Sequence, residues 1–254
     1  MARDPIEVLD ERAAPPARTT AYGEHADQVY DVRLPVRTTR GLTVVVVHGG
    51  FWRPEYDRAH ASRQAQAFAD AGYPVAVVEY RRTGVAGGGW PGTAEDVRDA
   101  LVAIRRDPQV GGSPAVLVGH SAGGQLVAWA AAQPWAHGLR GVVSLAGVLD
   151  LARGQATDVG GGAIDAFLGG TPEQVPGAYA AADPMGLSPN VPALVVHARD
   201  DDVVPFELSE RYAAAHHGPS VRLRPVADGG HYGLIDPEHP AFAEVLSAVD
   251  LLAS

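Results

Sequence analysis

Short apolar runs rich in β-branched residues alternate with amphipathic stretches along most of this chain. Strands covered on both faces read as continuous apolar runs, whereas helices repeat apolar residues every three or four positions. The amphipathic stretches predict helices at 58–71, 93–106, 122–133, 206–216 and within 240–252. The apolar runs predict strands at 28–34, 42–47, 75–80, 115–118, 141–146, 193–197 and 221–226.

Alternation of strand and helix predicts the α/β class, with a mostly parallel central sheet and helices on both faces. The strand at 28–34 is expected to form the edge of the sheet, after a surface arm at 11–26. Between residues 150 and 190 the periodicity weakens, and glycine pairs and prolines predict a short insertion of small helices that forms a partial lid. A length of 254 residues suits a single domain spanning 1–254.

The amino-acid composition excludes several kinds of reaction and binding site. The chain has no cysteine and no lysine, which excludes disulfides, thiolate metal sites, a cysteine nucleophile, a Schiff-base lysine and a P-loop lysine. A net charge of -10 with scattered arginines argues against a nucleic-acid partner. The polar amino terminus and the lack of an apolar stretch of about 18 residues predict no membrane association and a cytoplasmic location.

A candidate nucleophile lies in the sequence Gly-His-Ser-Ala-Gly at residues 119–123, between an apolar run and a helix-forming stretch. A sharp strand-to-helix turn strains the serine backbone, and glycines two positions before and after it remove Cβ atoms that would clash. The first amides of the following helix then face negative charge that develops on the serine oxygen. Ser121 is therefore the predicted nucleophile, with the amide of Ala122 as one oxyanion donor.

A serine nucleophile needs a base and a carboxylate that orients the base. Where the serine occupies a strand-to-helix turn of this kind, the acid follows it in the chain and the histidine follows the acid. His231 and His239 both follow the last predicted strand, and small neighbours let the loop of His231 reach the serine. His231 is the predicted base, and His239 the alternative. The acid falls within the three aspartates at 200–202. These aspartates and the nearby His197 also suggest a metal site, but no further ligand pair at convincing spacing supports it, so no metal is expected.

A second set of oxyanion donors is predicted in His-Gly-Gly-Phe-Trp at residues 48–52, directly after a central strand. A glycine pair lets the backbone turn its N–H groups toward a pocket, as in the His-Gly-Gly-Gly loops of lipases and esterases. The donors would be Gly50 and Phe51. Phe51 and Trp52 would wall the acyl side of the pocket, with core packing as the alternative for each, and Tyr232 is a further candidate for the substrate pocket.

Four motifs occur in order: His-Gly-Gly-Phe-Trp-Arg at 48–53, Gly-His-Ser-Ala-Gly-Gly at 119–124, Asp-Asp-Asp-Val-Val-Pro at 200–205 and Gly-His at 230–231. Together they resemble the α/β-hydrolase superfamily over nearly the full length. The first two are similar to the kynurenine formamidase (arylformamidase) and small carboxylesterase group. Glu-Tyr-Arg-Arg at 79–82, followed by Trp90, Pro91 and Asp96, also resembles the hormone-sensitive-lipase-like esterases.

The resemblance implies a particular acid. In such families the segment after the seventh strand commonly reads His-Gly-x-x-Asp-x-x-Val-Pro, and that Asp is the acid of the triad. The matching segment at 197–205 places the acid on Asp201, with Asp202 as runner-up, and Ala198 stands where the family has glycine.

The predicted function is a serine hydrolase that cleaves a small ester or amide through an acyl-enzyme, as a carboxylesterase or an arylformamidase does. A biosynthetic acyltransferase, cyclase or lyase with the same triad is the main alternative, because fold and triad do not separate these reactions. A third possible function is that of a non-enzymatic ligand-binding protein. No cofactor is expected; the expected partner is a small-molecule substrate, and a homodimer is left open.

Overall fold

The computed structural model describes residues 5–37, 39–216, 218 and 220–253. These residues form an eight-stranded sheet in the order β1-β2-β4-β3-β5-β6-β7-β8. β2 is antiparallel to both of its neighbours, and all the later pairs are parallel. The strands are β1 (Arg18–Ala21), β2 (Val29–Arg33), β3 (Thr43–Val47), β4 (Val75–Val78), β5 (Ala115–His120), β6 (Leu139–Leu145), β7 (Ala193–Ala198) and β8 (Val221–Val226).

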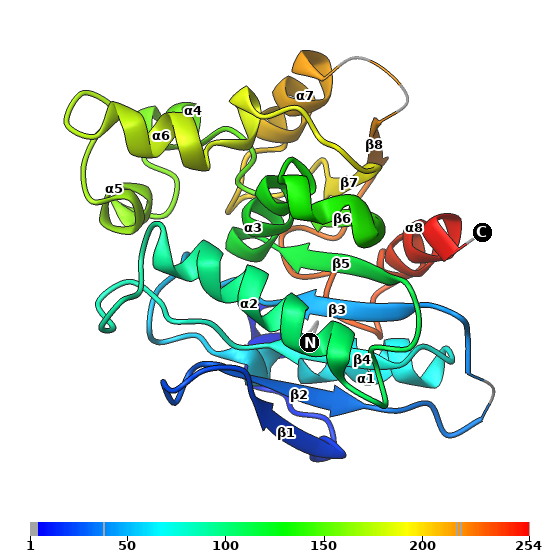
Figure 1. Ribbon diagram of the computed structural model, residues 1–254. Coiled ribbons are helices and arrows are strands. Elements are labelled where there is room, and N and C mark those ends of the chain that lie inside the picture. Colours follow the sequence, from blue (N-terminus) through cyan, green and yellow to red (C-terminus); the bar gives the residue numbers. More distant parts are fainter. Residues whose placement is uncertain (1–4, 38, 217, 219, 254) are drawn as a thin grey trace.

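The helices lie between the strands, as the alternating pattern predicts. The α-helices are α1 (Ser62–Asp70), α2 (Gly92–Arg106), α3 (Ala122–Ala131), α4 (Leu151–Ala156), α5 (Ala163–Leu168), α6 (Pro176–Ala182), α7 (Phe206–Ala215) and α8 (Phe242–Ala253). Short 3-10 turns are η1 (Pro5–Leu9), η2 (Arg58–Ala61), η3 (Pro134–Gly138) and η4 (Pro184–Gly186). The predicted insertion contains α4, α5, α6 and η4, and Figure 1 shows its three α-helices grouped together, away from α1 and α8.

One prediction about the sheet is wrong, because its edge is β1 and not the strand at 28–34. Residues 18–21 lie within the segment interpreted as a surface arm, yet they pair with β2 from Arg18 opposite Val32 to Ala21 opposite Val29. β1 alternates half-buried and exposed residues and has no apolar run. A short polar edge strand of this kind gives no hydrophobic signal in the sequence.

Both faces of the sheet are covered by apolar side chains. Along β3, Val45 and Val47 belong to the core layer that includes residues of α2 and α3, whereas Val44 and Val46 belong to the layer formed with α1 and α8. Successive side chains of a strand point to opposite faces, so a run of valines fills both layers. The parallel fold predicted from the apolar runs is thereby confirmed.

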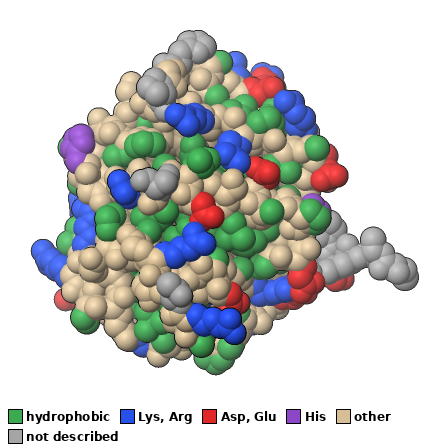
Figure 2. All heavy atoms as spheres, turned by 90° about the vertical axis from the view of Figure 1, so that its right-hand side faces the viewer, with side chains coloured by type: hydrophobic (Ala, Val, Ile, Leu, Met, Phe, Trp, Pro, Cys, Tyr) green, Lys and Arg blue, Asp and Glu red, His purple; other side chains and the backbone are tan. Residues whose placement is uncertain are grey.

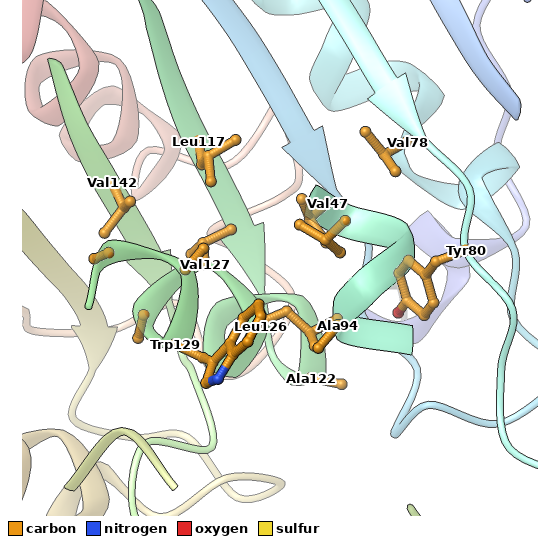
Figure 3. Packing of buried hydrophobic residues seen from close by; sticks show 14 of the residues in the cluster. Val47, Val78, Tyr80, Ala94, Leu117, Ala122, Leu126, Val127, Trp129 and Val142 are labelled. Atoms are coloured by element: carbon orange, nitrogen blue, oxygen red, sulfur yellow. The ribbon is translucent and has the colours of Figure 1, made fainter. Parts of the chain in front are cut away.

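α3 is the central helix, and all ten of its residues are buried. Figure 3 shows Leu126 and Val127 of α3 among apolar side chains of the sheet, including Leu117 and Val142. Because α3 follows β5 directly, this packing also fixes the turn that contains Ser121. The loops that follow β3, β5 and β7 lie at the carboxyl edge of the parallel sheet, where α/β proteins place their ligand sites.

Acidic and basic side chains are interspersed on the face of the molecule that Figure 2 shows. None of the helices within the described ranges is both long and apolar enough to cross a membrane.

Candidate active site

Ser121 occupies the sharp turn between β5 and α3, with φ 55° and ψ −118°. Non-glycine residues rarely adopt a positive φ, and such strain concentrates at functional sites. A Cβ on Gly119 would come within 2.1 Å of the Gly123 carbonyl oxygen, and one on Gly123 within 2.2 Å of the Val47 carbonyl oxygen. The two glycines therefore have the close-packing role that the sequence predicted.

His231 contacts the carboxylate predicted for it. Its Nδ1 lies 2.8 Å from Oδ2 of Asp201, whose side chain is fully buried. The other carboxylate oxygen accepts hydrogen bonds from the amides of Val203 and Val204, at 2.9 and 2.8 Å. Because the carboxylate accepts a hydrogen bond, the imidazole donates from Nδ1, and this tautomer leaves Nε2 available to take a proton.

A second histidine holds the same carboxylate. His197 Nε2 lies 3.0 Å from Oδ2 of Asp201 and 3.0 Å from the Val204 carbonyl, and its Nδ1 lies 2.7 Å from the Ser209 hydroxyl. Both partners of Nε2 are acceptors, so Nε2 donates. Burial alone would raise the pKa of Asp201, but the hydrogen bonds from His197 and His231 lower it below its ordinary value. Asp201 is thus ionised and fixed in orientation.

The three consecutive aspartates have different surroundings. Asp200 accepts hydrogen bonds from the amides of Gly229 and Gly230, at 3.3 and 2.9 Å, and so fixes the loop that ends at His231. Asp202 is exposed. Asp201 is therefore the carboxylate that the fold brings to His231, as the family pattern implied, and the runner-up Asp202 is not.

Ser121 and His231 line one small cavity of about 50 Å³, and both are almost fully buried. No hydrogen bond joins the Ser121 hydroxyl to His231 in the described part of the chain; in free enzymes this bond often tightens only with substrate bound. His120, next to the serine, connects the two loops, since its Nε2 lies 2.9 Å from the His231 carbonyl oxygen. Gly50, Phe51 and Tyr232 line the same cavity.

The loop after β3 contains the other predicted oxyanion donors. Gly50 has a φ of 103°, Phe51 of 51° and Trp52 of 56°, so three successive residues are left-handed. A Cβ on Gly50 would come within 2.3 Å of Tyr56, which explains the glycine. Within the described residues the amides of Gly50, Phe51 and Ala122 make no backbone hydrogen bond, and unpaired amides are what an oxyanion site requires.

Trp52 does not line the cavity, which corrects its assignment to the substrate pocket. Its side chain is fully buried and stacks on Phe167 of α5, with ring centroids 4.5 Å apart. The left-handed backbone at 51–52 directs successive side chains differently, so that Phe51 reaches the cavity while Trp52 enters the core. Tyr232 lines the cavity, as predicted.

The insertion contacts the oxyanion loop and not the cavity around Ser121. Arg53 donates hydrogen bonds to the carbonyl oxygens of Gly160 and Gly161. A Cβ on Gly160 would come within 2.6 Å of the Phe51 ring, so that ring packs directly on the backbone of the insertion. Together with the stacking of Trp52 on α5, these contacts couple the oxyanion loop to the insertion.

A buried ion-pair cluster supports the other side of the loop. His48 Nε2 lies 2.9 Å from Glu79 Oε1, and the Tyr80 hydroxyl donates to the His48 carbonyl oxygen at 2.8 Å. The second oxygen of Glu79 accepts from the amide of Arg58 at 2.8 Å. Although burial raises the pKa of Glu79, His48, Arg58 and Arg82 lower it to about 2. Glu79 therefore stays ionised inside the protein and anchors the residue that precedes the loop.

Two residues of the site were not found from the sequence. No sequence pattern gave His197 a catalytic or positioning role, although it begins the segment at 197–205, four residues before Asp201. His60 lies on η2, seven positions beyond the 48–53 motif and outside all four motifs, and the fold places it in the cavity wall. Among the described residues, no three His, Cys, Asp or Glu side chains are placed to hold a metal ion.

Comparison with solved structures shows a common fold at low sequence identity. A truncated carbohydrate esterase from gut microbiota is 19% identical, covers 94% of this chain and 99% of its own, and has a TM-score of 0.78. Propionate-bound esterase 2 from the Planctomycetes species Thermogutta terrifontis is 22% identical, with 93% of each chain covered and a TM-score of 0.71. The same esterase phosphonylated by sarin is 20% identical, covering 93% and 94%, with a TM-score of 0.73.

No curated protein sequence matches the chain significantly. A family model does match it: the BD-FAE model aligns with residues 30–215, which include Ser121 and Asp201 but end before His231. Because that match covers well over half of the chain and the sheet topology agrees with the esterase structures, this protein has an α/β-hydrolase fold and belongs to the BD-FAE family.

Proposed function

We propose that the protein is a serine esterase that hydrolyses esters of short acyl groups through an acyl-enzyme, with Ser121, His231 and Asp201 as its catalytic residues. The observation that carries this proposal is the bond from His231 Nδ1 to the buried Asp201 carboxylate, in an imidazole that lines the same cavity as the strained Ser121. The tautomer fixed by Asp201 is the one in which Nε2 accepts a proton.

Catalysis proceeds in two steps of the same kind. Ser121 attacks the ester carbonyl while His231 Nε2 takes its proton, and Asp201 stabilises the imidazolium that forms. His231 then gives this proton to the departing alcohol, which leaves the acyl group on the serine. Water repeats the sequence: His231 removes its proton, the acyl-serine bond breaks, and the free acid and Ser121 are released.

The amides of Gly50, Phe51 and Ala122 receive the negative charge that develops on the carbonyl oxygen in both steps. Ala122 is the first residue of α3, so the positive end of this helix adds to the effect. The His48–Glu79 cluster and the contacts of Arg53 with the insertion hold the loop that presents the other two amides.

The size of the cavity supports a short acyl group. A cavity of roughly 150 Å³ binds benzene, so one of about 50 Å³ holds only a few heavy atoms. His231 also lines a much larger open groove of about 800 Å³, bordered by Tyr232 and Asp202. Because His231 must protonate the leaving group, the alcohol lies on the groove side and can be large. A formamide such as formyl-kynurenine, whose acyl group is the smallest of all, also fits this division and belongs in the substrate panel.

The test is a Ser121→Ala variant assayed with p-nitrophenyl acetate and labelled with a fluorophosphonate probe. We expect kcat to fall by roughly 10⁴ to 10⁶ and labelling to be lost, because no other serine or threonine lines the cavity in the described part of the chain. Ser113→Ala, at the opposite end of β5, is the matched control and should behave as wild type. Turnover by Ser121→Ala close to the wild-type value would refute the proposal.

A further inference from the structure

His60 is a buried histidine in the wall of the catalytic cavity for which the proposed mechanism has no use. It lies on η2, is 6% exposed, and lines the cavity together with Ser121, His231 and Tyr56. Its ring packs edge-on against His48, with centroids 5.4 Å apart, and against Tyr56 at 6.3 Å. These contacts fix the imidazole in one place on the side of the cavity that the oxyanion loop forms.

The imidazole of His60 is polar but poorly satisfied. Its Nδ1 is buried and has no hydrogen-bond partner among the described residues. Burial and the neighbouring His48 lower its pKa to about 3, while Glu79 and a hydrogen bond with the Asp57 backbone oppose this shift without reversing it. At neutral pH the ring is therefore uncharged, with one nitrogen that donates and one that accepts. Because His60 lines the cavity, such a neutral ring can bond an uncharged polar group of a bound ligand.

The position of His60 decides whether it lies beside the alcohol or beside the acyl group of a bound ester. The alcohol of the ester must lie beside His231, on the side of the open groove, because His231 protonates it. His60 does not line that groove, whereas His231, Tyr232 and Val203 line both the groove and the cavity. The small cavity that His60 walls therefore receives the acyl group.

Building on the proposed function, we propose that His60 is a specificity residue that hydrogen-bonds an uncharged polar group on the acyl chain. The cavity favours esters of short hydroxy acids, with a hydroxyl on the carbon bonded to the carbonyl carbon, over their apolar isosteres. An uncharged hydroxyl suits a neutral imidazole, since it can donate to one ring nitrogen or accept from the other.

The test compares ethyl glycolate with ethyl propionate, in which a methyl replaces the hydroxyl, and measures acid release at constant pH. The readout is the glycolate-to-propionate ratio of kcat/KM, divided by the same ratio for hydrolysis by hydroxide, which removes the difference in intrinsic reactivity. For the wild-type protein we expect a corrected ratio of about 10 or more, because a site built to bond a hydroxyl rejects the analogue that lacks it.

Two variants test whether His60 is responsible. His60→Phe should bring the corrected ratio to about 1, whereas His60→Gln, which keeps a donor and an acceptor, should retain most of the preference. His137→Phe, at an exposed position on η3, is the matched control and should keep the wild-type ratio. Thermal unfolding establishes that each variant is folded.

Two results would overturn the inference. A wild-type corrected ratio near 1 would do so without any variant, and so would a preference that His60→Phe leaves intact. In both cases the protein would still cleave the two esters and Ser121 would still be labelled, so the proposed function would stand. Loss of both cleavage and labelling in the wild-type protein would instead refute the proposed function, and this inference with it.

Discussion

Replacing Glu79 by Gln tests the reasoning about the buried cluster that supports the oxyanion loop. The substitution keeps the shape of the side chain but removes the negative charge and replaces one acceptor oxygen by an NH2 donor. His48, Arg58 and Arg82 then lose the carboxylate that they share. Removing one partner of a buried ionic cluster is destabilising because the remaining charges stay desolvated.

The size of the effect follows from the pKa of Glu79. Its side chain is 1% exposed, and its pKa falls from 4.5 to about 2 in the folded protein. Since one pKa unit corresponds to about 1.4 kcal/mol, ionised Glu79 contributes about 3 kcal/mol to the free energy of unfolding at neutral pH. For a domain of this size that corresponds to a decrease in Tm of about 6–12 °C in Glu79→Gln.

The stabilisation by Glu79 decreases as the pH falls, because the pKa of Glu79 is lower in the folded than in the unfolded protein. The contribution of Glu79 is complete above its unfolded pKa near 4.5 and is lost as the pH falls toward 2. Urea unfolding at pH 7 and pH 3 should therefore show a difference between wild type and variant that shrinks from about 3 to about 1 kcal/mol.

A matched Glu-to-Gln control is available at the protein surface. Glu210 faces Arg199 at 3.9 Å, and both side chains are more than half exposed, so Glu210→Gln should change the free energy of unfolding by less than about 0.5 kcal/mol. The reasoning about the cluster is refuted if Glu79→Gln costs no more than this control, or if its cost does not depend on pH.

Two further substitutions test the site. Asp201→Asn should lower kcat for p-nitrophenyl acetate by about 10⁴ through the wrong imidazole tautomer, while Asp202→Asn stays within about threefold of wild type; equal losses would contradict the assignment of the acid. Gly160→Ala should lower the free energy of unfolding by about 1–3 kcal/mol and also lower kcat/KM, because its Cβ meets the Phe51 ring. Gly162 has a similar φ but open space around its Cβ position, so Gly162→Ala should show only the effect of backbone strain. Equal effects of the two glycine variants in urea unfolding and in the ester assay would show that the contact with Phe51 does not matter.

Local sequence patterns were sufficient for most of the fold and for the core of the candidate site. The strand β3 is apolar on both faces because helices cover both faces of the sheet. Continuous apolar runs of this kind therefore predict the strands of a parallel sheet. The turn that contains Ser121 was also recognisable in the sequence. Gly119 and Gly123 must lack a Cβ because each lies against a backbone carbonyl oxygen. The order of motifs then led to His231.

What the tertiary structure alone decided is how side chains that are distant in sequence meet. Composition alone does not separate the three adjacent aspartates; the family pattern implied Asp201, and packing brings its carboxylate to His231, thirty positions away. The fold also decided that Trp52 enters the core and not the pocket, whereas no local pattern marks His60 in the cavity wall or β1 at the edge of the sheet. Sequence periodicity records which face of an element is buried, whereas the partner on that face depends on contacts across the whole fold.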